Sequence, residues 1–144
     1  MKTMYSTRAK AQAGRAGHVE SEDGKLSLDL SVPTAMGGPG GDGTNPEQLF
    51  AGGYAACFHS AMQFIAGQKK IDLSGSSVTG EVGIGERPDG PGFALAVTLD
   101  IDLPSLPQAD ADELVQTAHA VCPYSNATRG NIDVQLKVSG KQTA

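Results

Sequence analysis

Apolar and polar residues alternate along several stretches of this chain, and a period of two is typical of a half-buried β-strand. The clearest stretch has an apolar residue at every second position from 93 to 103: Phe93, Leu95, Val97, Leu99, Ile101 and Leu103. The same pattern predicts strands over 26–32, 78–84 and 132–138, and a weaker one over 4–9. Asp23-Gly24 is typical of a tight turn, so we expect 26–32 to form a hairpin with 15–22.

A helix is predicted to begin abruptly at Pro46. Asn45 suits the N-cap, Pro46 suits the first helical position, and Gln48 falls at the capping-box position three residues after the cap. Gly67 is expected to end this helix near Lys70, after about six turns.

A second helix is predicted between Pro107 and Pro123, with acidic residues in its first turns that complement the helix dipole. The segment 34–44 contains five glycines, which predicts an irregular loop. Since no linker divides the chain, we expect one domain over 1–144 whose two halves each contain strands and one helix.

The composition narrows the class of protein. A net charge of -5 and a single adjacent basic pair, Lys69-Lys70, argue against nucleic-acid binding, which needs clustered Lys and Arg. Neither a secretory signal nor a long apolar run is visible, so we expect no membrane contact and a cytoplasmic location. In a reducing compartment, a lone cysteine pair is more often used for redox chemistry or metal binding than as a structural disulfide.

The two cysteines, Cys57 and Cys122, are therefore the first candidates for chemistry. A thiol reacts as its thiolate, and Cys57 lies about 16 Å along the helix from Pro46, too far from the N-terminus for that to lower its pKa. His59 lies roughly 200° round the helix from Cys57 and points elsewhere. A cation from another segment is therefore needed to lower the pKa of the Cys57 thiol. The sequence pattern does not choose among four candidates: Arg8, Arg15, Arg87 and Arg129.

Plainer interpretations remain for the same residues. Cys57 can be a small core residue in a helix whose small neighbours allow close packing. His119 and Cys122 share a helical face and could begin a zinc site, although Cys57 and His59 face apart and leave such a site one ligand short. The histidines otherwise resemble ordinary surface or capping residues: His18, His59 and His119.

Two long motifs carry a resemblance to a known family. They are NPEQLF followed by GYAACF at 45–58, and VCPYSNATRGNI at 121–132. In this order they resemble the organic hydroperoxide resistance branch of the OsmC superfamily over about 14–138, and the second motif favours that branch over OsmC itself. The resemblance implies an α+β OsmC-like fold with antiparallel sheets, central helices and an intertwined homodimer.

The resemblance also implies a function. Cys57 matches a peroxidatic cysteine that becomes a sulfenic acid on reducing an alkyl or fatty-acid hydroperoxide, and Cys122 matches the cysteine that resolves it to a disulfide. Arg15 matches the arginine that holds the thiolate, and Glu47 matches its carboxylate partner. The family commonly has Gly-Gly-Arg followed by an acidic residue, whereas Gly14 and Ala16 flank Arg15 here. The implied reductant is an external dithiol, such as a lipoylated protein, and no bound cofactor or metal is implied.

Helix geometry constrains how this site is assembled. Glu47 and Cys57 are ten residues apart, about 15 Å along a straight helix, so one arginine does not easily reach both. We expect the site to form across the homodimer. An apolar pocket for the alkyl chain is expected from the 34–44 loop and four side chains, each of which is individually more typical of core: Phe50, Met62, Phe64 and Phe93.

Two other classes of function stay open on the same fold. A non-enzymatic small-molecule binder would keep the pocket without needing Cys122, Arg15 and Glu47 together. A thiol redox sensor would keep both cysteines and turn over slowly. Steady-state turnover with a dithiol distinguishes both from the peroxidase that the sequence favours.

Overall fold

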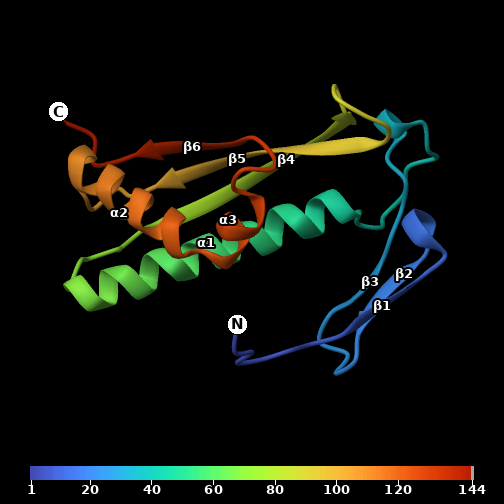
Figure 1. The fold of residues 1–144 in the computed structure, drawn as a ribbon, viewed down its shortest axis with the longest axis horizontal. Coiled ribbons are helices and arrows are strands. Elements are labelled where there is room, and N and C mark those ends of the chain that lie inside the picture. Colours follow the sequence, from blue (N-terminus) through green and yellow to red (C-terminus); the bar gives the residue numbers. More distant parts are fainter. Residues whose placement is uncertain (144) are drawn as a thin grey trace. The chain divides into compact units, whose positions relative to one another are not determined.

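A computed structural model describes residues 1–143 and divides the chain into two compact units, Met1–Leu49 and Phe50–Ala144. The first contains a three-stranded sheet and the second a three-stranded sheet covered by helices (Figure 1). The single domain expected over 1–144 stays a prediction.

The sheet of the first unit is antiparallel, with strand order β1-β2-β3. Its strands are β1 (Ala9–Gln12), β2 (His18–Ser21) and β3 (Ser27–Asp29). The predicted turn is present, because the Gly24 amide donates to the Ser21 carbonyl at 2.9 Å. The strand expected over 4–9 is misplaced, because β1 begins only at Ala9. The short 3-10 helix η1 (Gly14–Ala16) connects β1 to β2, and the two strands pair from Gln12 opposite His18 to Ala9 opposite Ser21.

The glycine-rich segment that follows is irregular, as predicted, apart from the 3-10 helix η2 (Thr34–Met36). It folds back on β3, since the Thr44 amide donates to the Asp29 carbonyl at 2.8 Å. Gly43 permits this approach, because an added Cβ there would lie 2.4 Å from the Leu30 carbonyl carbon. The N-cap is confirmed: Asn45 Oδ1 accepts the Gln48 amide at 2.8 Å, and α1 (Pro46–Lys69) begins at Pro46.

The sheet of the second unit has the order β4-β5-β6. Its strands are β4 (Ser77–Glu86), β5 (Phe93–Asp102) and β6 (Val134–Ser139). β4 and β5 are antiparallel as expected, but β5 and β6 are parallel, so the expectation of purely antiparallel sheets is wrong for this pair. The reason is the connection: the chain crosses through two helices before it returns, and such a crossover is what a parallel pair requires.

Those two helices are α2 (Gln108–Val121) and α3 (Pro123–Thr128), and with α1 they cover one face of the sheet (Figure 1). One apolar face of β5 meets the buried faces of α1 and α2 in a single core that includes Phe58, Met62, Leu99, Ile101, Leu114 and Val115. β4 passes unusually close to α1, because a Cβ added at Gly80 would lie 2.7 Å from the Ala51 carbonyl oxygen. The core therefore fixes α1, α2 and the sheet in one arrangement.

α1 ends in a Schellman motif one residue beyond Lys69. The Ile71 amide donates to the Ala66 carbonyl at 2.8 Å, and Lys70 takes the left-handed conformation with φ 55. The helix end near Lys70 is as predicted, but the helix runs through Gly67 and Lys70 makes the turn. In the part of the chain that the structure describes, no helix has the length and apolar character to span a membrane.

Candidate functional site

The two cysteines lie side by side in the second unit. Their Sγ atoms are 3.7 Å apart and both thiols are free. Cys57 is half-buried on α1, whereas Cys122 is completely buried at the corner between α2 and α3. Since sulfur atoms in a disulfide are about 2.05 Å apart, a small movement joins them. The fold thus brings two residues 65 positions apart in sequence into contact, and their joint role in one reaction stays a prediction.

The surroundings of Cys57 do not by themselves favour the thiolate. Burial raises the pKa of the Cys57 thiol above its ordinary value, the Tyr124 backbone N–H opposes that rise, and the neighbouring Cys122 thiol adds to it. Burial disfavours the charged form, whereas a hydrogen-bond donor favours it. A thiolate at neutral pH therefore needs a cation.

The four candidate arginines have different partners. Arg87 pairs with Asp89 at 3.2 Å. Arg129 donates to Asn126 Oδ1 and to the His119 carbonyl. Arg8 lines a hollow in the first unit, and Arg15 binds a carboxylate there.

That carboxylate is Glu47, the partner that the resemblance implies, and the pair is bidentate. Arg15 donates from Nη1 and Nη2 to the two Glu47 oxygens at 2.8 and 2.7 Å. The hydrogen bond from Arg15 lowers the pKa of Glu47, and the bond to Glu47 raises the pKa of Arg15. Arg15 on η1 thus carries a charge whose position is fixed by Glu47. The two residues before it, Ala13 and Gly14, take left-handed backbone conformations with φ 60 and φ 55.

A buried polar network that the motifs did not indicate joins the segments that carry the two cysteines. Tyr54 Oη lies 2.8 Å from Ser125 Oγ and 3.2 Å from Thr128 Oγ1, and His119 Nδ1 lies 2.8 Å from the same Ser125 Oγ. Tyr54 and Ser125 are completely buried and Thr128 is 5% exposed. Burial together with the charge of Arg129 lowers the pKa of His119, so its ring is neutral at pH 7. The signal was present: a buried tyrosine usually needs a partner for its hydroxyl, and the second motif is rich in hydroxyl residues.

Aromatic rings cover the helix next to Cys57. Tyr124 packs on Phe50 and Tyr54 with ring centroids 6.3 and 5.8 Å apart. Gly53, one helical turn before Cys57, leaves room for this, since a Cβ there would lie 3.0 Å from Tyr124 Oη. One of the small residues around Cys57 therefore serves to seat the Tyr124 ring.

The four side chains expected to line an alkyl pocket fall in different environments. Phe50 is partly buried against the core, and Met62 is completely buried within it. Phe64 and Phe93 are 63% and 70% exposed. Met62 is a core residue here, and the role of all four in substrate binding stays a prediction.

The histidines have ordinary partners. His59 Nε2 lies 2.9 Å from Ser76 Oγ, and His18 Nδ1 lies 2.7 Å from Asp29 Oδ1. Within residues 1–143, no three His, Cys, Asp or Glu side chains are grouped so that they could hold a metal ion. His119, the possible zinc ligand, instead contacts Ser125.

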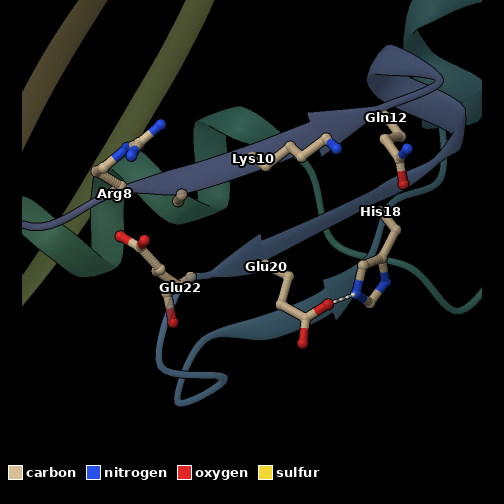
Figure 2. A pocket seen from close by; sticks show the side chains of 8 residues that line it. Arg8, Lys10, Gln12, His18, Glu20 and Glu22 are labelled. Carbon is tan, nitrogen blue, oxygen red and sulfur yellow. Dashed lines mark ion pairs between the residues drawn. The ribbon is translucent and has the colours of Figure 1, made fainter.

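An open hollow of about 530 Å³ lies on the sheet of the first unit (Figure 2). It is lined by charged and polar side chains of β1, β2 and the residues next to them, among them Arg8, Lys10, Gln12, His18, Glu20 and Glu22. His18 Nε2 lies 3.7 Å from Glu20 Oε2. The mixed charges make this hollow unlike an alkyl-binding pocket, and it contains neither cysteine.

Comparisons with known proteins agree with the motifs. The family model described as OsmC-like protein matches residues 38–137. The organic hydroperoxide resistance protein of Xanthomonas axonopodis pv. citri is 52% identical over 139 residues, 96% of each chain. The crystal structure of an organic hydroperoxide resistance protein from Legionella pneumophila matches with a TM-score of 0.90 at 54% identity, covering 96% of this chain and 99% of that one. OhrB of Bacillus subtilis matches with a TM-score of 0.86 at 42% identity, covering 95% and 100%.

Proposed function

This chain belongs to the organic hydroperoxide resistance branch of the OsmC-like family, and from that membership we propose that it is a thiol peroxidase that reduces organic hydroperoxides. One observation carries the proposal: a half-buried thiol and a fully buried thiol lie 3.7 Å apart, both reduced. This short spacing supports a reaction of Cys122 with an oxidised Cys57.

The proposed cycle begins at Cys57. Its thiolate attacks the terminal oxygen of ROOH, the O–O bond breaks, and the released alkoxide takes a proton to leave as ROH. Cys57 is then a sulfenic acid. The sulfur of Cys122 attacks the Cys57 sulfur and its thiol gives up a proton, the sulfenic hydroxyl takes a proton and leaves as water, and a disulfide forms.

Arg15 and Glu47 are proposed to support the first step. The fixed cation of Arg15 would stabilise both the Cys57 thiolate and the negative charge that develops on the peroxide oxygens. Glu47 would hold the guanidinium by its bidentate pair. The role of Arg15 is motivated by the raised pKa of Cys57, which leaves a need for a cation.

Regeneration is proposed to use an external dithiol, such as the lipoyl group of a lipoylated protein in the cytoplasm. One reductant thiolate opens the Cys57–Cys122 disulfide to give a mixed disulfide, and the second thiol of the reductant then displaces the protein sulfur. No other cofactor is needed in this cycle, because the electrons come from the dithiol. The protein is proposed to work as an intertwined homodimer.

The unequal burial of the two cysteines predicts which sulfur the reductant attacks. Cys122 is completely buried and Cys57 is half-buried, so an incoming thiolate reaches Cys57 and Cys122 departs. Oxidised protein treated briefly with 2-mercaptoethanol and quenched in acid should carry the adduct on Cys57, with Cys122 free to be alkylated. Peptide mass mapping measures this directly, and an adduct on Cys122 would overturn the assignment.

The proposed function is tested by turnover. Pure protein should consume an alkyl hydroperoxide at a steady rate with dihydrolipoamide, and Cys57→Ser should lose that activity. Arg87→Ala is a matched control, because Arg87 is a surface residue whose side chain pairs with Asp89. If the wild type with intact thiols shows no turnover, the peroxidase proposal fails. The chain would then be assigned as a non-enzymatic small-molecule binder or a slow thiol redox sensor.

A further inference from the structure

The buried Tyr54–Ser125–His119 hydrogen bonds link the two segments that carry the cysteines. Tyr54 lies three residues before Cys57 on α1, and Ser125 lies three residues after Cys122 on α3. The 2.8 Å contact between their hydroxyls therefore joins α1 to α3 at residues that are less than one helical turn along the chain from each cysteine. Thr128 adds a second contact to the same tyrosine at 3.2 Å.

The corner that carries Cys122 is fixed from its other side as well. His119 lies three residues before Cys122 on α2, and its Nδ1 meets Ser125 Oγ at 2.8 Å across the corner. Arg129 donates to the His119 carbonyl and to Asn126 Oδ1, which ties the end of α2 to α3. Cys122 itself donates its backbone amide to the Ala118 carbonyl at 2.8 Å.

The hydroxyl protons can be assigned without leaving an unpaired group. With His119 neutral, its Nδ1 accepts from Ser125, Ser125 accepts from Tyr54, and Thr128 is free to donate to the Ser125 carbonyl at 3.2 Å. Among the described residues, no buried side-chain nitrogen or oxygen lacks a partner. A fully satisfied buried network rigidifies the segments it joins, whereas removing one member leaves the others unpaired.

We propose that Tyr54, Ser125 and His119 are positioning residues that hold Cys122 against Cys57, so that the resolving step is fast. None of the three contributes a reacting atom. Holding the sulfurs at 3.7 Å removes most of the entropy that disulfide closure would otherwise cost, which raises both its rate and its equilibrium. This inference deepens the proposed function, because it assigns the residues that let Cys122 intercept the sulfenic acid before a second peroxide does.

The test uses Tyr54→Phe, which keeps the ring and removes only the hydroxyl. Its matched control is Ser76→Ala, which removes the 2.9 Å contact with His59 on the same helix, away from Cys122. His119→Leu is a second variant at the half-buried end of the network, used in case Tyr54→Phe folds poorly.

Two readouts separate positioning from general stability. The first is the equilibrium between the Cys57–Cys122 disulfide and dithiothreitol, which requires no peroxide. Since one hydrogen bond contributes a modest free energy, Tyr54→Phe should lower this constant by roughly three- to tenfold, with no change in Ser76→Ala. The second is the fraction of Cys57 carried to sulfinic acid by excess alkyl hydroperoxide, which should rise in Tyr54→Phe, while the rate of the first oxidation is unchanged.

An unchanged disulfide equilibrium and unchanged overoxidation in folded Tyr54→Phe and His119→Leu would overturn the proposal. An equal effect of Ser76→Ala would also overturn it, because the effect would then be one of general stability. If the wild type consumes no hydroperoxide, the proposed function fails, and the dithiothreitol equilibrium still decides whether the network positions the thiols.

Discussion

Cys57 has surroundings that oppose its own reactivity. Burial raises the pKa of its thiol, and of its neighbours only the Tyr124 backbone N–H counters that rise, while Cys122 adds to it. A nucleophilic cysteine needs the opposite shift. Arg15 is proposed to provide it, because its charge is fixed by Glu47 through two hydrogen bonds.

The charge on that pair is secure across the working pH range. Glu47 has a pKa lowered from 4.5, mainly by the hydrogen bond from Arg15. The stabilisation from this pair is therefore fully present above pH 4.5 and is lost only as the pH falls through the lowered value. Protonation of the Cys57 thiolate is expected to slow peroxide reduction at a higher pH than protonation of Glu47 does.

The role of Arg15 predicts a pH shift. Removing the cation in Arg15→Ala should raise the pKa of Cys57, so the thiolate fraction at pH 7 falls about tenfold for each unit of the rise. The rate of Cys57 alkylation by iodoacetamide in the Cys122→Ser background, followed against pH, should show its midpoint at higher pH in Arg15→Ala. Arg87→Ala is the control with an unchanged midpoint, and coincident profiles for all three proteins would exclude Arg15 as the activating cation.

At the scale of single residues, the motifs drew attention to charged and nucleophilic side chains and missed the neutral polar ones. Cys57, Cys122, Arg15 and Glu47 came from motifs, and the structure groups them as Cys57 with Cys122 and Arg15 with Glu47. Motifs could not show that Ser125 is a buried hydrogen-bond partner, because burial depends on how α3 packs on α1. Met62 shows the same limit, since its apolar side chain suits a pocket or a core equally and lies in the core.

At the scale of elements, alternation and caps located most helices and strands. Six apolar residues at alternate positions predicted β5 within one residue, and Asn45 with Pro46 predicted the start of α1. Direction could not be predicted from periodicity, and so the parallel pairing of β5 and β6 was missed. Pairing direction depends on which end of the sheet the crossover returns to, which is a tertiary property.

The close approach of β4 to α1 gives a prediction about stability. A Cβ at Gly80 would lie 2.7 Å from the Ala51 carbonyl oxygen, a backbone atom that cannot rotate away. Gly80→Ala should therefore destabilise the fold by about 1–3 kcal/mol. Thermal or urea unfolding measures it.

Gly85→Ala on the same strand is the matched control, since an added Cβ there meets no atom within 4 Å. It should leave stability nearly unchanged or raise it slightly. Equal loss in both variants would mean that close contact with α1 at Gly80 does not explain the effect.

At the scale of the whole molecule, one chain carries both sulfur atoms of the proposed cycle, 3.7 Å apart. In that proposal, oxidation at Cys57, resolution by Cys122 and attack by a reductant would all use these two atoms. The disulfide would close a loop of more than sixty residues, because the two cysteines are 65 positions apart in sequence. It would thereby hold α1 against the corner between α2 and α3 while the protein is oxidised. The intertwined homodimer and the assembly of the site across it stay predictions.

The central claim is that Cys57 and Cys122 act in one reaction with an organic hydroperoxide. The most direct test is to add one equivalent of cumene hydroperoxide to reduced protein and measure the intact mass. The wild type should lose two hydrogens, and Cys122→Ser should gain one oxygen on Cys57. An unchanged wild-type mass, or an oxygen retained on Cys57 with Cys122 still alkylatable, would contradict it.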